Sequence, residues 1–175
     1  MKIEGRRKFI KQSALAVASM VIPYSKDFLF LDAKRKFKLS LNPRAIGVKL
    51  SQLQLIETAS SIGFEAVVPV TDEIATMSDA QIDLLMGKMT ALELTWDVAG
   101  LPVDFRNDEV VFIQDLMRFP EVGAALKSVG VDRMSTWIMP THETYTYRKN
   151  FEVHARRIRQ MATILGDYGI QLGLE

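Results

Sequence analysis

The sequence predicts a parallel α/β barrel of the (β/α)8 TIM-barrel type, and about the first half of it. From residue 37 on, short apolar segments alternate with longer segments of helical periodicity. The connection after the first strand candidate, residues 41–47, contains one glycine, whereas an open nucleotide-binding sheet places a glycine-rich phosphate loop there. A full barrel takes about 250 residues. Residues 37–175 are expected to hold four strand–helix units and a fifth strand.

Five short segments are the candidates for the barrel strands. They are residues 37–40 with 46–48 close behind, 66–70, 92–98, 134–139 and 170–174. Their apolar residues run almost without interruption, which is typical of strands covered on both faces. These segments therefore favour a parallel sheet with helices on both faces over a sheet that exposes one face to solvent.

Capping signals mark the first two long helices. Ser51 with Gln54, and Ser78 with Gln81, have the spacing of a capping box, and Gly63 supplies a left-handed stop. The second helix carries an apolar stripe made of Ile82, Leu85, Met86 and Met89. Both helices are thus expected to lie with one face on the sheet.

Two further helical regions follow. Asp108 is expected to cap a helix that runs through Leu116, and Pro120 to open a second short helix that ends near Gly130. Residues 151–165 predict a long helix that stops at Gly169. Its expected inward residues are Phe151, Ile158, Met161, Ala162 and Leu165.

The N-terminal residues have the layout of an export signal. Residues 1–23 join a basic start to an apolar stretch of about ten residues, too short to cross a membrane. Arg6-Arg7 with Phe9 and Lys11 resembles the twin-arginine motif, with Gly5 in place of its hydroxyl residue. We expect export to the periplasm by the twin-arginine machinery, with the signal either cleaved or kept as an anchor. Residues 24–36 read as a solvated linker, followed by the barrel domain at 37–175.

Charge and composition exclude several classes of function. Residues 1–38 carry ten Lys and Arg against three Asp and Glu, and residues 39–175 carry twelve against eighteen. An acidic body disfavours binding to a phosphate backbone, so no nucleic-acid partner is expected. The chain has no cysteine and two histidines, which excludes disulfides and thiolate chemistry.

Three stretches carry a resemblance to a known family. They are residues 100–105 (GLPVDF), 135–140 (STWIMP) and 172–175 (LGLE). Together they resemble the sugar phosphate isomerase/epimerase superfamily of xylose isomerase-like TIM barrels, over about residues 37–175. Several members of that superfamily carry twin-arginine leaders.

The resemblance implies a metal-dependent chemistry on a sugar or polyol. In the superfamily a divalent metal polarises the substrate oxygens and two glutamates move a proton to and from carbon. It implies that Glu175, at the end of the fifth strand, is both a catalytic residue and a metal ligand. Mg²⁺ or Mn²⁺ suits oxygen ligands best, and Zn²⁺ is possible. The remaining ligands would lie beyond Glu175, so this chain alone is expected to be inactive.

Other residues are weaker candidates. His142 follows the fourth strand and either binds a sugar hydroxyl or lies in a surface loop, and Trp96 and Trp137 either stack on the sugar or pack in the core. Asp97, Asp104 and Arg106 could bind hydroxyls, although Asp104 and Arg106 could equally pair with each other. His154 is expected to be structural. Arg156, Arg157 and Arg159 are expected on a solvated face.

Two other functions compete with the isomerase. An exported, non-catalytic sugar-binding barrel would lack the later carboxylates and histidine. A metal nuclease similar to endonuclease IV would need histidines on early strands, which this sequence does not have there. Open edges on the first and fifth strands predict aggregation or a homo-oligomer.

Overall fold

The computed structural model describes residues 36–175. The chain divides into two units, residues 1–36 and residues 37–175. The proposed signal segment 1–23 and most of the proposed linker 24–36 lie outside the described residues. All the described strands and helices belong to the second unit.

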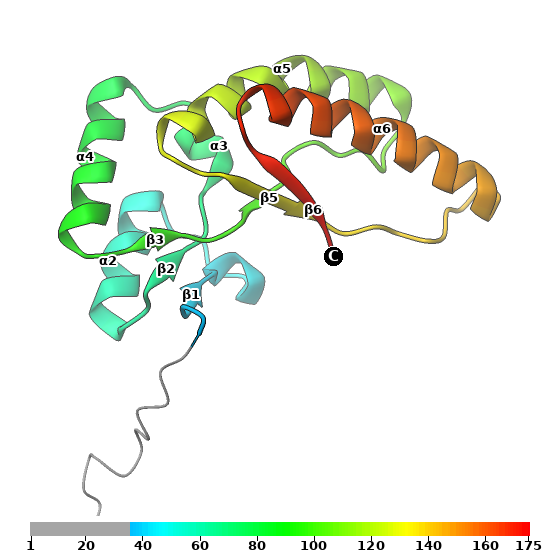
Figure 1. Ribbon diagram of the computed structural model, residues 1–175. Helices are drawn as coiled ribbons and strands as arrows, with labels where there is room; N and C mark the ends of the chain where they lie inside the picture. The colour runs from blue at the N-terminus through cyan, green and yellow to red at the C-terminus, as the bar shows by residue number, and fades with distance from the viewer. Residues whose placement is uncertain (1–35) are drawn as a thin grey trace, which may run out of the picture. The chain divides into compact units, whose positions relative to one another are not determined.

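Six short strands form two parallel sheets (Figure 1). One sheet contains β1 (Ser40–Leu41), β2 (Ala66–Val67) and β3 (Thr95–Trp96), and the other contains β4 (Ala99–Gly100), β5 (Arg133–Thr136) and β6 (Gln171–Leu174). Every strand pair is parallel. Only Asp97 and Val98 separate β3 from β4, so the two sheets continue each other through one extended segment. The strand order therefore follows the chain order, as in a partial α/β barrel, and confirms the predicted fold class.

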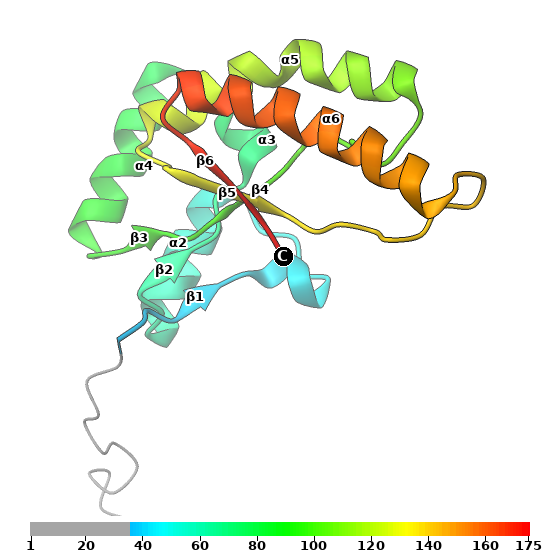
Figure 2. The same cartoon turned by 45° about the vertical axis from the view of Figure 1, so that its right-hand side comes forward.

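Helices connect the strands (Figure 2). They are the 3-10 helix η2 (Pro43–Ile46) and the α-helices α2 (Gln52–Ile62), α3 (Thr71–Ile74), α4 (Asp79–Ala91), α5 (Glu109–Ser128) and α6 (Tyr147–Asp167). At least one helix lies between the two members of every hydrogen-bonded strand pair, which is why these neighbours can run parallel. None of these helices is long and apolar enough to cross a membrane.

The predicted caps at Ser51, Ser78 and Asp108 are confirmed, whereas the long helix expected from residue 151 starts earlier, at Tyr147. The side chain of Ser51 accepts the backbone N–H of Gln54, and the backbone N–H of Ser51 donates to the Gln54 side chain at 3.0 Å. Ser78 and Gln81 form a second capping box. Gly63 ends α2 with φ of 83°, a left-handed conformation that an L side chain rarely adopts. These local signals are readable in the sequence because each capping residue finds its partner within one helical turn.

Most strand predictions are wrong in extent; the segment 92–98, for example, forms strand β3 only over Thr95–Trp96. Residues 46–48 are not a strand, because Pro43 starts η2 and Gly47 ends it in the left-handed region. The segment 66–70 forms a strand over only two residues, since the backbone N–H of Val70 donates to the buried Gln52 side chain at 2.6 Å instead of to a strand. Val70 then becomes the residue from which α3 begins.

Helix α5 passes through Pro120 without a break, which contradicts the two helices predicted there. Proline removes one backbone hydrogen bond from a helix interior. Phe112, Phe119 and Leu126, spaced seven residues apart, are each at most 1% exposed and fix one face of the helix to the core. That burial outweighs the local cost of the proline.

The predicted inward face of helix α6 is confirmed only in part: Met161 and Leu165 are buried and Ile158 packs against the core. Its buried residues are Asn150, His154, Arg157, Met161 and Leu165, whereas Phe151 is 63% exposed and Ala162 is also exposed. Arg157 is only 3% exposed, so the predicted solvated position for this arginine is wrong. The polar half of the buried stripe covers the loop after β4, which needs hydrogen-bond donors rather than apolar contacts.

Candidate functional site

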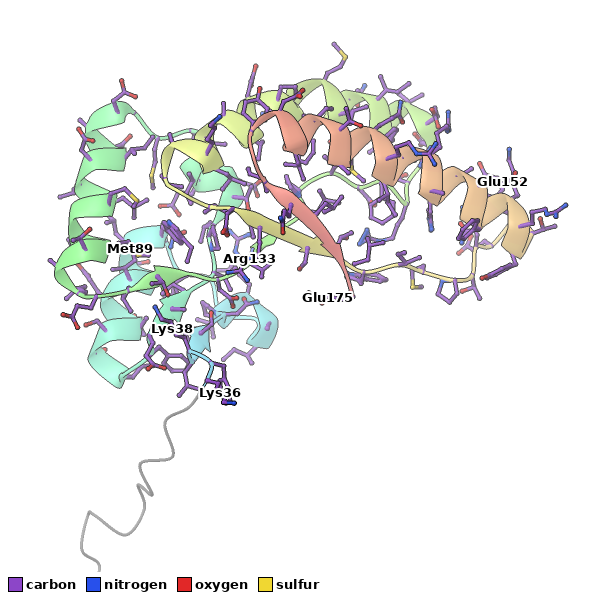
Figure 3. All side chains as sticks on the ribbon, viewed as in Figure 1. Lys36, Lys38, Met89, Arg133, Glu152 and Glu175 are labelled. Atoms are coloured by element: carbon purple, nitrogen blue, oxygen red, sulfur yellow. The ribbon has the colours of Figure 1, made fainter. Side chains whose placement is uncertain are left out.

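Glu175 lies at the carboxyl end of β6, beside the end of β5 (Figure 3). Its backbone N–H donates to the carbonyl of Thr136 at 2.9 Å. The hydroxyl of Ser135 donates to its Oε1 at 2.7 Å. Strand register sets this contact, because Ser135 pairs with Gly173 and parallel neighbours two residues further on point to the same face. The carboxylate is therefore oriented at the end where barrel enzymes place their active sites.

A single carboxylate fits one position of a metal site and no more. Ser135 occupies Oε1, which leaves Oε2 able to act as an oxygen ligand. Across residues 36–175 no group of three or more His, Cys, Asp or Glu side chains is placed to hold a metal ion. The described residues thus do not complete a metal site by themselves.

Trp137 and Arg106 meet at the same end of the sheet. Trp137 follows β5 and is 50% exposed. The guanidinium carbon of Arg106 lies 4.2 Å from the centre of the Trp137 ring and 4.6 Å from that of Phe105. These distances are those of cation–π contacts, which hold the guanidinium in place. The Asp104 side chain forms no ion pair with this guanidinium; its Oδ1 accepts the backbone N–H of Arg106 at 3.2 Å.

His142 is fixed in the loop after β5. Its Nδ1 accepts the backbone N–H groups of Thr144 at 3.1 Å and Tyr145 at 3.2 Å. Its ring stacks on Tyr145 with the ring centres 4.1 Å apart. Because Nδ1 acts as an acceptor, the neutral ring carries its proton on Nε2. His142 therefore offers an N–H donor, as the predicted contact with a sugar hydroxyl requires.

A hollow of about 460 Å³ opens between these loops and α6. Its polar lining residues are Arg106, Thr141, His142, Glu143, Thr144, Asn150 and His154. His154 is 5% exposed and packs edge-on against Phe105, with the ring centres 5.2 Å apart. Burial lowers the pKa of His154, and the positive charges of Arg106 and Arg157 act in the same direction. The imidazole is thus held neutral against the hollow.

Arg157 ties the loop before α5 to α6. Its guanidinium donates to the carbonyls of Phe105 at 2.8 Å and Asn107 at 2.6 Å. It also pairs with Glu109 at 2.6 Å, and that hydrogen bond lowers the pKa of the Glu109 carboxyl. Arg157 thereby fixes the backbone on both sides of Arg106.

Trp96 lies away from this group. Its indole N–H donates to the carbonyl of Val129 at 2.7 Å, where α5 ends, and its ring packs against the core. Asp97 is likewise engaged locally, since its Oδ1 accepts the backbone N–H of Val98 at 2.8 Å. Of the residues predicted to contact substrate, the structure places Trp137 and His142 in loops that follow β5, and it leaves Trp96 in a packing position.

Three solved structures share this arrangement of strands and helices. A xylose isomerase domain protein from Alicyclobacillus acidocaldarius matches with a TM-score of 0.63 at 20% identity, over 78% of this chain and 49% of its own. D-psicose 3-epimerase from Clostridium cellulolyticum, solved with D-tagatose, matches with 0.63 at 17% identity, over 79% and 52%. The IolI protein, solved with a bound zinc atom, matches with 0.63 at 18% identity, over 79% and 51%. The chain has part of the xylose isomerase-like barrel fold.

The chain spans about half the length of each of these structures. A scan against protein-family models and a search of curated proteins find no match to it. The likeness thus rests on the course of the backbone, and it confirms the fold that the three sequence stretches suggested.

Sequence reasoning missed the role of two arginines. Arg106 was one of several loop residues, and Arg157 was part of a basic run on a helix. Each finds its contacts in segments distant along the chain, in Trp137 for Arg106 and in residues 105–109 for Arg157. The spacing along the helix did signal that Arg157 is buried. Arg157 lies three residues after His154 and four before Met161, so it falls on the same buried face of α6.

Proposed function

We propose that the protein containing this chain is a sugar isomerase or epimerase, in which Glu175 acts at the carbon that gains and loses a proton. One observation carries the proposal: the Glu175 carboxylate lies at the carboxyl end of β6, where the hydroxyl of Ser135 holds it. Strand β6 is the fifth barrel strand when β3 and β4 are counted as one extended segment. The likeness to a D-psicose 3-epimerase and to a xylose isomerase domain protein supports the same class of reaction.

The local contacts suit a proton-transfer role. A hydrogen bond from Ser135 to one oxygen fixes the plane of the carboxylate and leaves the other oxygen free. Proton abstraction next to a sugar carbonyl needs such a positioned base, and positioning contributes a large part of the rate. Trp137 offers an exposed aromatic face and His142 an N–H donor, which suit a sugar ring and its hydroxyls.

A divalent metal is part of the proposal, with Glu175 as one ligand. Mg²⁺ or Mn²⁺ matches a carboxylate oxygen, and Zn²⁺ is an alternative because IolI was solved with zinc. When bound, the metal would polarise the substrate oxygens. Its other ligands would have to come from outside residues 36–175, because no group of three or more potential ligands lies together within that range. Residues 1–175 alone are therefore proposed to be inactive.

Location and assembly also remain proposals. Residues 6–11 support export through the twin-arginine machinery to the periplasm. Within the described residues β1 and β6 each have one strand neighbour, which supports self-association of the isolated chain.

The test replaces Glu175 with Gln in the complete protein. Purified protein with added Mn²⁺ is incubated with D-fructose, D-tagatose and D-psicose, and the products are separated by chromatography. Glu175→Gln is expected to lower turnover at least about a hundredfold, because it removes the base and a ligand charge together. Glu152→Gln is the matched control, since Glu152 is an exposed glutamate on α6, apart from Glu175 in Figure 3.

A non-catalytic sugar-binding barrel is the second candidate. It is favoured by the lack of a three-ligand cluster among residues 36–175. It predicts that the complete protein binds sugars with equal affinity in the presence and absence of EDTA and never converts them. Conversion of any ketose that EDTA abolishes would exclude it.

A further inference from the structure

The guanidinium of Arg106 is fixed in place but has no polar partner. Within residues 36–175 no carboxylate, carbonyl or hydroxyl forms a hydrogen bond or ion pair with it; its contacts are the rings of Phe105 and Trp137. Ring contacts cover the faces of a guanidinium and leave its N–H groups at the edge free. Arg106 is half-buried and its side-chain nitrogens are not among the buried unpaired atoms, so its N–H groups reach solvent, which a ligand with oxygen acceptors would replace.

The backbone beside Arg106 is held rigidly. The carbonyls of Phe105 and Asn107 both accept hydrogen bonds from Arg157, at 2.8 Å and 2.6 Å. Arg157 is itself 3% exposed. The neighbours of Arg106 on both sides are thus anchored to α6, and the guanidinium is presented without a large loss of conformational freedom on binding.

The hollow in front of Arg106 is lined by further donors. His142 carries its proton on Nε2, and no described residue accepts that proton. Thr141 adds a hydroxyl to the lining, whereas the Thr144 hydroxyl lies 3.3 Å from His142 Nδ1. His154 forms a buried wall, and its Nδ1 has no hydrogen-bond partner among the described residues. Glu143 is the acidic side chain in the lining, and it lies on an exposed loop.

We propose that this hollow binds the anionic group of an acidic sugar, a carboxylate or a phosphate, with Arg106 as the residue that recognises it. The arginine edge matches two oxygens of a carboxylate or phosphate in a bidentate geometry, which a neutral hydroxyl does not offer. A hollow of about 460 Å³ accommodates a hexose-sized ligand. The inference deepens the proposed function and rests on it for the statement that this acidic sugar is the substrate.

Isothermal titration calorimetry of the complete protein tests the site without relying on turnover. The probes are D-glucuronate for a carboxylate, D-glucose 6-phosphate for a phosphate, and D-glucose as the neutral reference. We expect at least one charged probe to bind about tenfold more tightly than glucose, and Arg106→Gln to remove that difference while glucose binding stays unchanged. The charged probe that binds the Arg106→Gln variant more weakly than the wild type shows whether the site recognises a carboxylate or a phosphate.

Two further variants make the result specific. Arg159→Gln, which removes an exposed arginine from α6, is the charge-matched control and should leave all three affinities unchanged. Glu143→Gln should tighten binding of the charged probe a few-fold, because it removes a like charge from the lining. Equal affinity of wild-type protein for charged and neutral probes would overturn the proposal. So would a folded Arg106→Gln variant that keeps the preference, with folding checked by circular dichroism.

The outcomes separate this inference from the proposed function. Arg106-dependent binding in a protein that converts no sugar would uphold the anion site and refute the isomerase. Conversion of neutral ketoses, with no effect of Arg106→Gln on any affinity, would uphold the isomerase and refute the anion site.

Discussion

Replacing Arg157 with Met tests how much stability depends on a buried cation in the helix layer. The guanidinium reaches the carbonyls of Phe105 and Asn107 and the carboxylate of Glu109. Met keeps the length of the side chain but offers no donor. The Glu109 side chain is 47% exposed and regains water, so the main loss comes from the two carbonyls.

The expected cost follows from those two groups. An unsatisfied buried acceptor costs about 1–3 kcal/mol, so the two carbonyls set the scale of the loss. Relief of the buried charge offsets part of this. We therefore expect Arg157→Met to lower the free energy of unfolding by about 3 kcal/mol, measured by urea denaturation.

Arg156→Met is the matched control. Arg156 lies on the same helix and pairs with the same Glu109 oxygen at 3.0 Å, but its side chain is 55% exposed. Exposed pairs are worth about 1 kcal/mol or less. Equal effects of the two substitutions, or a loss below about 1 kcal/mol for Arg157→Met, would refute the conclusion that burial and the two carbonyls make Arg157 important.

Two other predictions concern packing and pH. A Cβ on Gly123 would lie 2.5 Å from the ring of Tyr168, so Gly123→Ala should destabilise the fold by about 1–3 kcal/mol. Gly87→Ala is the control, since a Cβ there meets open space and the change should be neutral or stabilising. Thermal melting compares the two variants, and equal melting temperatures would contradict the close approach of Gly123 to Tyr168. Burial lowers the folded-state pKa of His154 below the ordinary histidine value of 6.5, so the unfolded chain binds the proton first and stability should fall as pH drops through 6.5. His154→Leu should reduce the dependence of the unfolding free energy on pH between pH 7 and 5, measured by urea denaturation. An unchanged pH dependence would show that other groups cause it.

The sequence was sufficient for the starts of α2, α4 and α5 and for the fold class. Ser51 and Ser78 each find their partner within one turn, so the signal is local. The alternation of apolar segments with helical ones is likewise a short-range pattern, and it predicted the parallel strands now observed.

The errors share a cause in long-range packing. Pro120 predicts a break by its own chemistry, and only the burial of Phe119 shows why α5 continues. Arg157 belongs to a basic run that reads as solvated, because the carbonyls it satisfies lie about fifty residues earlier. The contact of Arg106 with Trp137 joins two loops in the same way, so no local pattern could reveal the hollow.

Solvent exchange at carbon is the most direct test of the central claim, that the Glu175 carboxylate moves a proton to and from a sugar. The complete protein is incubated in D₂O with a ketose and Mn²⁺, and deuterium at the carbons next to the carbonyl is followed by NMR. The proposal predicts deuterium incorporation by the wild-type protein and by Glu152→Gln, and none above background by Glu175→Gln. Incorporation at the wild-type rate by Glu175→Gln would show that another group moves the proton and would contradict the role assigned to Glu175.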